Sequence, residues 1–151
     1  MGGRRMNREI LFRGKRIDNG EWVEGNLFVG DDGQCEILIG TKIIRISYPV
    51  IPETVRQYTG VKDKNNKKIF ESDILRGYQY PYLSYDDFNY YAEVIYFDNC
   101  PAFGIYTFKN PNLNVVRGIS AGNTALMEDW ESENWEIIGN IHDNPEIFGD
   151  E

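Results

Sequence analysis

Short apolar segments separated by polar turn residues make up the first third of the chain. Strands are predicted at residues 10–13, 22–29, 35–39 and 43–50. The turn between the first two contains Asp18, Asn19 and Gly20, and Asn-Gly readily adopts the positive φ angles of a tight hairpin turn. Pro49 and Pro52 are expected to end the fourth strand, because proline cannot donate a ladder hydrogen bond. This pattern predicts an N-terminal β meander.

A second set of strands follows. These strands are predicted at residues 55–59, 69–70, 74–75, 92–97, 103–108 and 135–142. Gly60 ends the first of them, and a run of charged and turn-forming residues, 63–68, separates it from the apolar pair Ile69-Phe70. A hairpin followed by a closing strand is similar to a small SH3-like barrel, which we expect to form the C-terminal part of the chain.

Only two segments are predicted to be helical. The first is residues 124–133, where Thr124 is a suitable N-cap and Leu126 and Trp130 lie on one side. The second is a short helical turn at 144–148. The predicted fold class is therefore mainly β with one short helix: an N-terminal β meander (about 6–52) plus a C-terminal SH3-like small barrel (53–148).

Nine apolar or aromatic residues of these strands are predicted to be mostly buried. They are Trp22, Tyr58, Ile69, Ile74, Val94, Tyr96, Phe103, Trp135 and Ile137.

The segment 77–91 contains seven aromatic residues without regular alternation. They are Tyr78, Tyr80, Tyr82, Tyr85, Phe88, Tyr90 and Tyr91. A monomeric protein rarely leaves a large aromatic patch in water, and tyrosine is well suited to interfaces. We therefore predict a long loop that contacts another protein chain, in the first place a second copy of this one. Burial of the rings against the barrel is the alternative.

Composition is that of a soluble globular protein, with 41% hydrophobic and 26% charged residues. No apolar run approaches the roughly 18 residues of a membrane helix, and no apolar segment typical of a signal peptide follows Arg4 and Arg5. Residues 1–5 precede a second possible start, Met6, and are expected to be either an extension or a remnant of cloning. Cys35 and Cys100 are too few for a disulfide framework, so we expect them reduced and buried in a cytoplasmic protein.

Charge is distributed unevenly along the chain, whose net charge is −8. Residues 1–76 contain 14 Lys and Arg against 11 Asp and Glu, whereas residues 77–151 contain 2 against 13. The two parts therefore carry +3 and −11. Either they simply face different solvent, or a basic N-terminal surface meets an acidic C-terminal surface within or between subunits.

No residue pattern indicates catalysis, a cofactor or a metal site. His142 is the one histidine, and Asp143 beside it in a strand could not orient it as a base. The cysteines lack the spacing of a zinc site. Residues 63–68 resemble a calcium loop only superficially, since Lys67 and Lys68 occupy positions that need an oxygen ligand and a glycine. No glycine-rich phosphate loop follows a strand. We expect no enzyme activity.

Three stretches resemble the YopX family of bacteriophage and prophage proteins. These are the opening residues 10–22, the run Gln57-Tyr58-Thr59-Gly60-Val61-Lys62-Asp63-Lys64-Asn65-Asn66 with the following Glu71-Ser72-Asp73-Ile74, and residues 135–146. Family members usually have glycine where Ser72 stands, so this turn either differs or tolerates strain. The resemblance implies a single YopX-like domain over residues 1–151 in a bacterial host cell. No biochemical activity is established for the family.

The function predicted first is a non-enzymatic, phage-derived accessory protein that binds another protein and itself. Nucleic-acid binding is the alternative, based on the lysine tip Lys62, Lys64, Lys67 and Lys68 and on the basic residues near the start. Against it, the pI is near 4.7 and the aromatic segment has no basic residue, whereas a phosphate-tracking groove needs cations and stacking rings together. An acidic mimic of DNA, or an enzyme without a recognisable site, comes third.

Overall fold

The computed structural model describes residues 7–78, 89–97, 101–109, 123–126 and 135–149, in two compact units. The first unit ends at Gly60 and the second begins at Val61. The sequence pattern put a boundary between subdomains earlier, near residue 52. Residues 56 and 57 belong with the first unit because they pair with Arg13 and Phe12.

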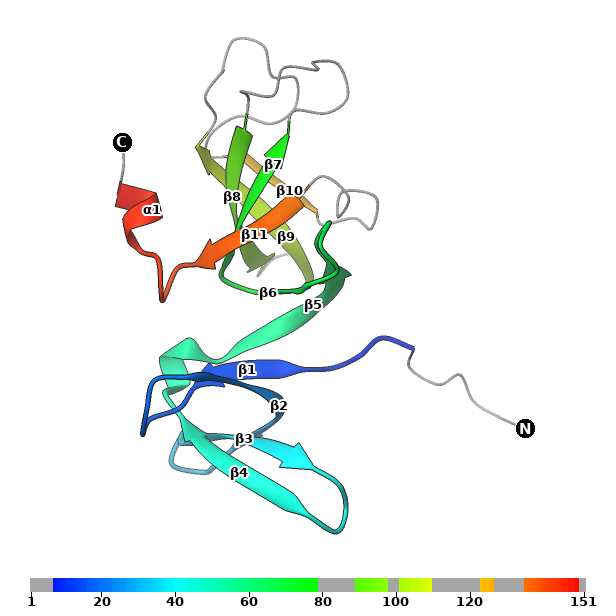
Figure 1. The fold of residues 1–151 in the computed structure, drawn as a ribbon, viewed down its shortest axis with the longest axis vertical. Coiled ribbons are helices and arrows are strands. Elements are labelled where there is room, and N and C mark those ends of the chain that lie inside the picture. Colours follow the sequence, from blue (N-terminus) through cyan, green and yellow to red (C-terminus); the bar gives the residue numbers. More distant parts are fainter. Residues whose placement is uncertain (1–6, 79–88, 98–100, 110–122, 127–134, 150–151) are drawn as a thin grey trace, which may run out of the picture. The chain divides into compact units, whose positions relative to one another are not determined.

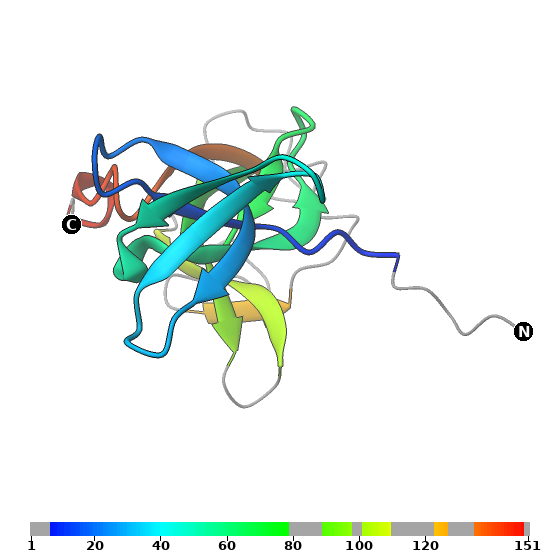
Figure 2. The ribbon, with the colours of Figure 1, turned by 90° about the horizontal axis from the view of Figure 1, so that it is seen from below.

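The first unit is an antiparallel sheet with the order β4-β3-β2-β1-β5. Its strands are β1 (Phe12–Lys15), β2 (Trp22–Val29), β3 (Cys35–Gly40), β4 (Arg45–Val50) and the beginning of β5 (Arg56–Lys62), and a short 3-10 turn, η1 (Pro52–Thr54), precedes β5. The strands β2, β3 and β4 lie side by side in chain order (Figure 1, Figure 2). The predicted meander is confirmed.

The sheet of the first unit curls until the end of β1 meets β4. Arg16 forms a bridge with Val50, and the Ile17 N–H donates to the Pro49 carbonyl oxygen at 3.0 Å. Gly14 permits this approach, because a Cβ there would lie 3.0 Å from the Val50 side chain. The core inside the curl consists of Cys35, Ile37 and Val50, with Phe12, Val23, Leu27 and Val55 packed against it.

In the first unit, the structure confirms the prediction for Cys35 and contradicts the one for Pro49. Cys35 is a free, buried cysteine, as predicted, while Cys100 lies outside the described residues. Pro49 does not end the fourth strand but lies within β4, opposite Glu36. A proline is tolerated there because the Pro49 carbonyl oxygen, and with it the nitrogen, faces Ile17 and not β3, so no ladder hydrogen bond to β3 needs an N–H at this residue.

The second unit contains a five-stranded antiparallel sheet with the order β10-β9-β8-β7-β11. Its strands are β7 (Asp73–Tyr78), β8 (Asn89–Phe97), β9 (Ala102–Lys109), β10 (Asn123–Leu126) and β11 (Trp135–Asn140). The short strand β6 (Lys68–Phe70) follows the end of β5, and a short helix, α1 (Glu146–Gly149), ends the unit. The mainly β class is confirmed. Among the described strands no pairing closes this sheet, so the SH3-like barrel stays a prediction.

The core of the second unit is made by residues from β6, β7, β8, β9 and β11. Its buried members are Ile69, Leu75, Ala92, Val94, Ile105 and Trp135. Gly77 makes room for Trp135, since a Cβ at Gly77 would come within 2.6 Å of the indole ring. The predicted burial of Tyr58, Ile69, Ile74, Val94 and Trp135 is confirmed. Trp22, Phe103 and Ile137 are half-buried.

Two sequence predictions are wrong in the second unit. Residues 124–126 are not helical but form the strand β10, in which Thr124 pairs with Tyr106 and Leu126 with Gly104. Pairing with β9 overrides the local helix preference of this segment, and residues 127–133 lie outside the described part. Tyr96 is 46% exposed although it shares a face with Val94, because it lies near the end of β8, beyond the core. Its ring instead contacts Phe103 edge-on, with centroids 5.3 Å apart.

Candidate functional site

Asp63, in the signature run of the second unit, folds the turn between β5 and β6. It is 5% exposed. Its Oδ1 accepts hydrogen bonds from the backbone N–H groups of Asn65 and Lys67, both at 2.9 Å. Its Oδ2 accepts one from the N–H of Ile137, on β11, at 3.0 Å. The carboxylate therefore shapes the turn and fastens it to the neighbouring strand.

Ser72 and Asp73 form a second turn of the same unit. Ser72 has a φ of 71°, the left-handed conformation that glycine adopts without strain, so of the two outcomes expected for this turn, it is strain that is tolerated. Its N–H donates to the Val94 carbonyl oxygen at 2.8 Å. Buried Asp73 accepts from the Phe70 N–H through Oδ2 at 2.8 Å. The turn thus joins β6, β7 and β8.

Asn140 organises the third signature stretch, after β11. Its Oδ1 accepts from the backbone N–H groups of His142 and Asp143 at 3.0 and 2.9 Å, and its Nδ2 donates to Asp143 Oδ2 at 3.0 Å. The Asn144 carboxamide packs so close to Gly139 that a Cβ added at Gly139 would overlap the carboxamide. His142 is half-buried in this turn. The motifs that carry the family resemblance therefore have a structural explanation.

The lysine tip is only partly free in solvent. Lys62 and Lys67 are exposed and Lys68 is half-buried. Lys64 Nζ lies 3.5 Å from Glu136 Oε2. The same oxygen accepts a hydrogen bond from Arg76 Nη2 at 2.8 Å. The hydrogen bond from Arg76, with the positive charges of Arg76 and Lys64, lowers the pKa of Glu136 below its usual value.

The aromatic segment falls largely outside the described residues. Tyr80, Tyr82, Tyr85 and Phe88 lie there, so their predicted role in an interface remains a prediction. Tyr78 ends β7 and pairs with Asn89 in β8. Tyr90 and Tyr91 also belong to β8, opposite Gly77 and Arg76, and the Tyr91 side chain is half-buried. The flanks of the predicted loop are thus a β ladder.

Sequence reasoning missed an exposed apolar surface on the first unit. We call it the hairpin surface: Ile39, Ile43, Ile44 and Ile46, from β3, the β3–β4 hairpin and β4, with Ile39 directly opposite Ile46. Ile43 is 92% exposed, Ile44 70% and Ile46 51%. The available signal was the adjacent pair Ile43-Ile44 inside the polar hairpin tip, which the weak alternation of residues 43–50 obscured.

Thr41 holds the tip of this hairpin in place. Its Oγ1 accepts from the N–H groups of Ile43 and Ile44, both at 3.2 Å, and its N–H donates to the Ile44 carbonyl oxygen at 2.7 Å. Gly40, with a φ of 133°, is required because any Cβ there would overlap the Ile44 carbonyl. The two isoleucines therefore project from a turn that is fixed by its own hydrogen bonds.

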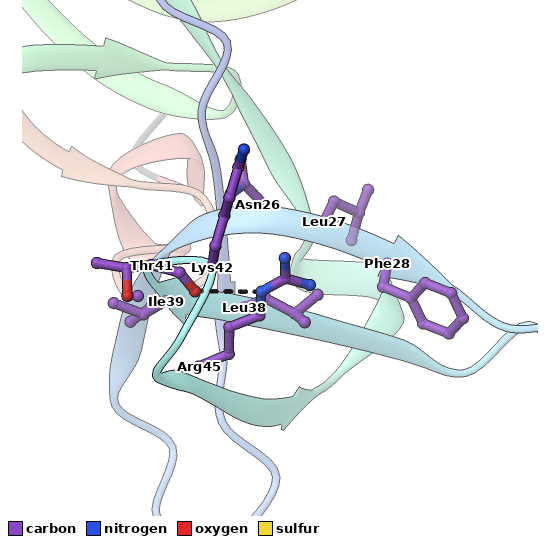
Figure 3. A pocket seen from close by; sticks show the side chains of 9 residues that line it. Asn26, Leu27, Phe28, Leu38, Ile39, Thr41, Lys42 and Arg45 are labelled. Carbon is purple, nitrogen blue, oxygen red and sulfur yellow. Dashed lines mark hydrogen bonds between the residues drawn. The ribbon is translucent and has the colours of Figure 1, made fainter.

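Beside the hairpin surface lies a hollow of about 440 Å³ (Figure 3). Its lining comprises Asn26, Leu27, Phe28, Leu38, Ile39, Gly40, Thr41, Lys42 and Arg45. Lys42 and Arg45 come from the hairpin, and Asn26 and Phe28 from β2 (Figure 3). Arg45 Nε donates to the Thr41 carbonyl oxygen at 3.2 Å, which fixes the guanidinium at this place. The hollow combines two cations with apolar side chains.

The described residues contain neither a metal-binding cluster nor a membrane-spanning helix. No cluster of three or more His, Cys, Asp or Glu side chains in these ranges could hold a metal ion. None of the helices described here has the length and apolar character needed to cross a membrane.

The chain is similar to a family of proteins and to a solved structure. The sequence model of the family described as YopX protein matches residues 11–148. The crystal structure of protein EF1440 from Enterococcus faecalis is 26% identical, with a TM-score of 0.47, and the match covers 94% of this chain and 99% of that one. No match was found among curated proteins.

Proposed function

Because this chain belongs to the YopX family, we propose that it is a phage- or prophage-derived accessory protein that acts by protein–protein binding, including self-association. In this proposal it catalyses no reaction and works in the bacterial cytoplasm. The family match covers nearly the whole chain, and the signature turns at Asp63, Ser72 and Asn140 have backbone-folding roles.

The observation that carries the proposal is the hairpin surface. Ile43, Ile44 and Ile46 are each more than half exposed, and Ile39, the cross-strand partner of Ile46, is 40% exposed. Fully burying one isoleucine side chain contributes about 1.5–3 kcal/mol, so these residues leave a substantial free energy to be gained by association. Contiguous exposed apolar side chains with a polar rim are typical of protein contact surfaces.

The hairpin surface is also preorganised for binding. The hydrogen bonds of Thr41 hold the Ile43-Ile44 turn in one conformation, so little ordering entropy is lost when a partner arrives. The aromatic segment 77–91 is proposed as a second contact region on the strength of its sequence alone.

The test is the molar mass in solution, measured by light scattering over a range of concentrations. We expect the wild type to exceed the monomer mass and the double variant Ile43→Ser/Ile44→Ser to approach it, because the variant loses the most exposed apolar side chains. The matched control is Ile10→Ser/Ile17→Ser, which removes two isoleucines, 38% and 56% exposed, elsewhere on the first unit.

The control variant should keep the wild-type mass, and circular dichroism should show all three proteins folded. A monomeric wild type, or an Ile43→Ser/Ile44→Ser variant with the wild-type mass, would contradict the proposal.

A further inference from the structure

The hollow beside the hairpin is positively charged in an acidic protein. Lys42 and Arg45 line it, and among its described lining residues there is no carboxylate. Both side chains are exposed, and the bond from Arg45 Nε to the Thr41 carbonyl oxygen leaves the terminal guanidinium nitrogens to other acceptors. With a net charge of −8 on the chain, this local sign indicates an anionic occupant.

The apolar part of the surroundings favours a polypeptide over a nucleic acid. Phe28 is the one aromatic ring among the described residues that line the hollow, whereas Leu27, Leu38 and Ile39 in the same lining are aliphatic. Single-stranded nucleic acid binds to stacking rings along a cationic track. Aliphatic side chains complement apolar side chains of another protein, so the expected occupant carries both carboxylates and apolar groups.

We propose that the hollow receives the acidic half of a second copy of this chain, with Lys42 and Arg45 pairing with its carboxylates. The inference rests on the proposed function. Residues 77–151 contain 13 Asp and Glu against 2 Lys and Arg, which makes another copy a complementary partner. Arg45 is suited to a two-pronged hydrogen bond with a carboxylate, while Ile43 and Ile44 cover the adjacent apolar contact.

Such ion pairs should make self-association sensitive to salt. Exposed charges are screened over about 8–10 Å at physiological ionic strength, while apolar contacts are not weakened by screening. Sedimentation equilibrium of the full chain at low and high salt separates the ionic contribution to self-association, which salt weakens, from the apolar contribution. We expect the dimerisation constant of the wild type to weaken as sodium chloride is raised.

The variant that tests the site is Lys42→Glu/Arg45→Glu. Reversal of both charges should weaken self-association about tenfold or more at low salt. Lys62→Glu/Lys67→Glu is the matched control, because it changes the net charge equally at two exposed lysines of the second unit and should have much less effect. The single variant Lys42→Glu keeps the hydrogen bond from Arg45 to the Thr41 carbonyl oxygen, so it controls for misfolding of the double variant. It should weaken self-association less than the double variant does.

Equal weakening in the site and control variants would overturn the inference, because net charge alone would then explain the effect. No weakening in Lys42→Glu/Arg45→Glu would also overturn it, and the proposed function would still stand if Ile43→Ser/Ile44→Ser dissociates. A wild type that stays monomeric overturns both. Salt-sensitive binding of a fluorescent 20-mer of oligothymidine, lost in the charge-reversed variant, would overturn it in favour of nucleic acid.

Discussion

At the residue scale, single polar side chains shape the backbone of the second unit. Asp63 receives three backbone N–H groups, and Asn140 receives two. The sequence permitted a turn at 63–68 to be predicted from its composition. It did not indicate that Asp63 is buried or that it reaches Ile137, since a contact between residues 74 positions apart leaves no local signal. At Ser72 the sequence left a different turn or tolerated strain open, and the φ of 71° corresponds to tolerated strain.

Replacement of Asp63 should therefore destabilise the protein although the residue lies in a polar turn. Asp63→Ala removes three hydrogen bonds to a buried carboxylate, and a hydrogen bond to a charged group contributes about 1.5–3 kcal/mol, so we expect a loss of roughly 3 kcal/mol or more. Asp63→Asn keeps one carbonyl oxygen and should cost less. Urea unfolding measures both, and a loss below about 1 kcal/mol for Asp63→Ala would contradict this role.

At the element scale, turn chemistry and apolar alternation located most of the strands. The predicted segment 22–29 coincides with β2 (Trp22–Val29), and 35–39 differs from β3 (Cys35–Gly40) by one residue. Periodicity failed where the decisive interaction is not local. Residues 124–126 became a strand by pairing with β9, and Tyr96 follows the alternation of β8 but lies beyond the core. Alternation identifies a face of a strand, not how far the core extends along it.

Trp135 and Tyr96 provide a contrasting pair of substitutions at this scale. Trp135→Ala removes a 5% exposed ring from the core of the second unit and should cost about 3–5 kcal/mol. Tyr96→Ala removes a ring that is 46% exposed and should cost clearly less. Thermal and urea denaturation of the two variants measure their losses of stability. Equal losses, or an unchanged midpoint for Trp135→Ala, would mean that the core is not where the structure places it.

At the scale of the whole molecule, the candidate site lies outside the segment that the sequence predicted to be an interface. The density of aromatic residues predicted a contact at residues 77–91, and only the flanks of that segment are described. The hairpin surface arises because Gly40 and Thr41 form a turn that projects Ile43 and Ile44 into solvent. An isoleucine pair in a strand-like segment is normally read as core. Only the three-dimensional fold distinguishes a buried pair from an exposed one.

The central claim is that the hairpin surface is a protein contact, and amide hydrogen exchange of the unmodified protein tests it most directly. Exchange would be followed by mass spectrometry in a dilute sample and in a concentrated, self-associated one. The account predicts slower exchange on association for peptides covering residues 41–48, with unchanged exchange in the turn at 17–20, between β1 and β2, which serves as the internal reference. Identical exchange of residues 41–48 in both samples, with association verified by light scattering, would contradict the account.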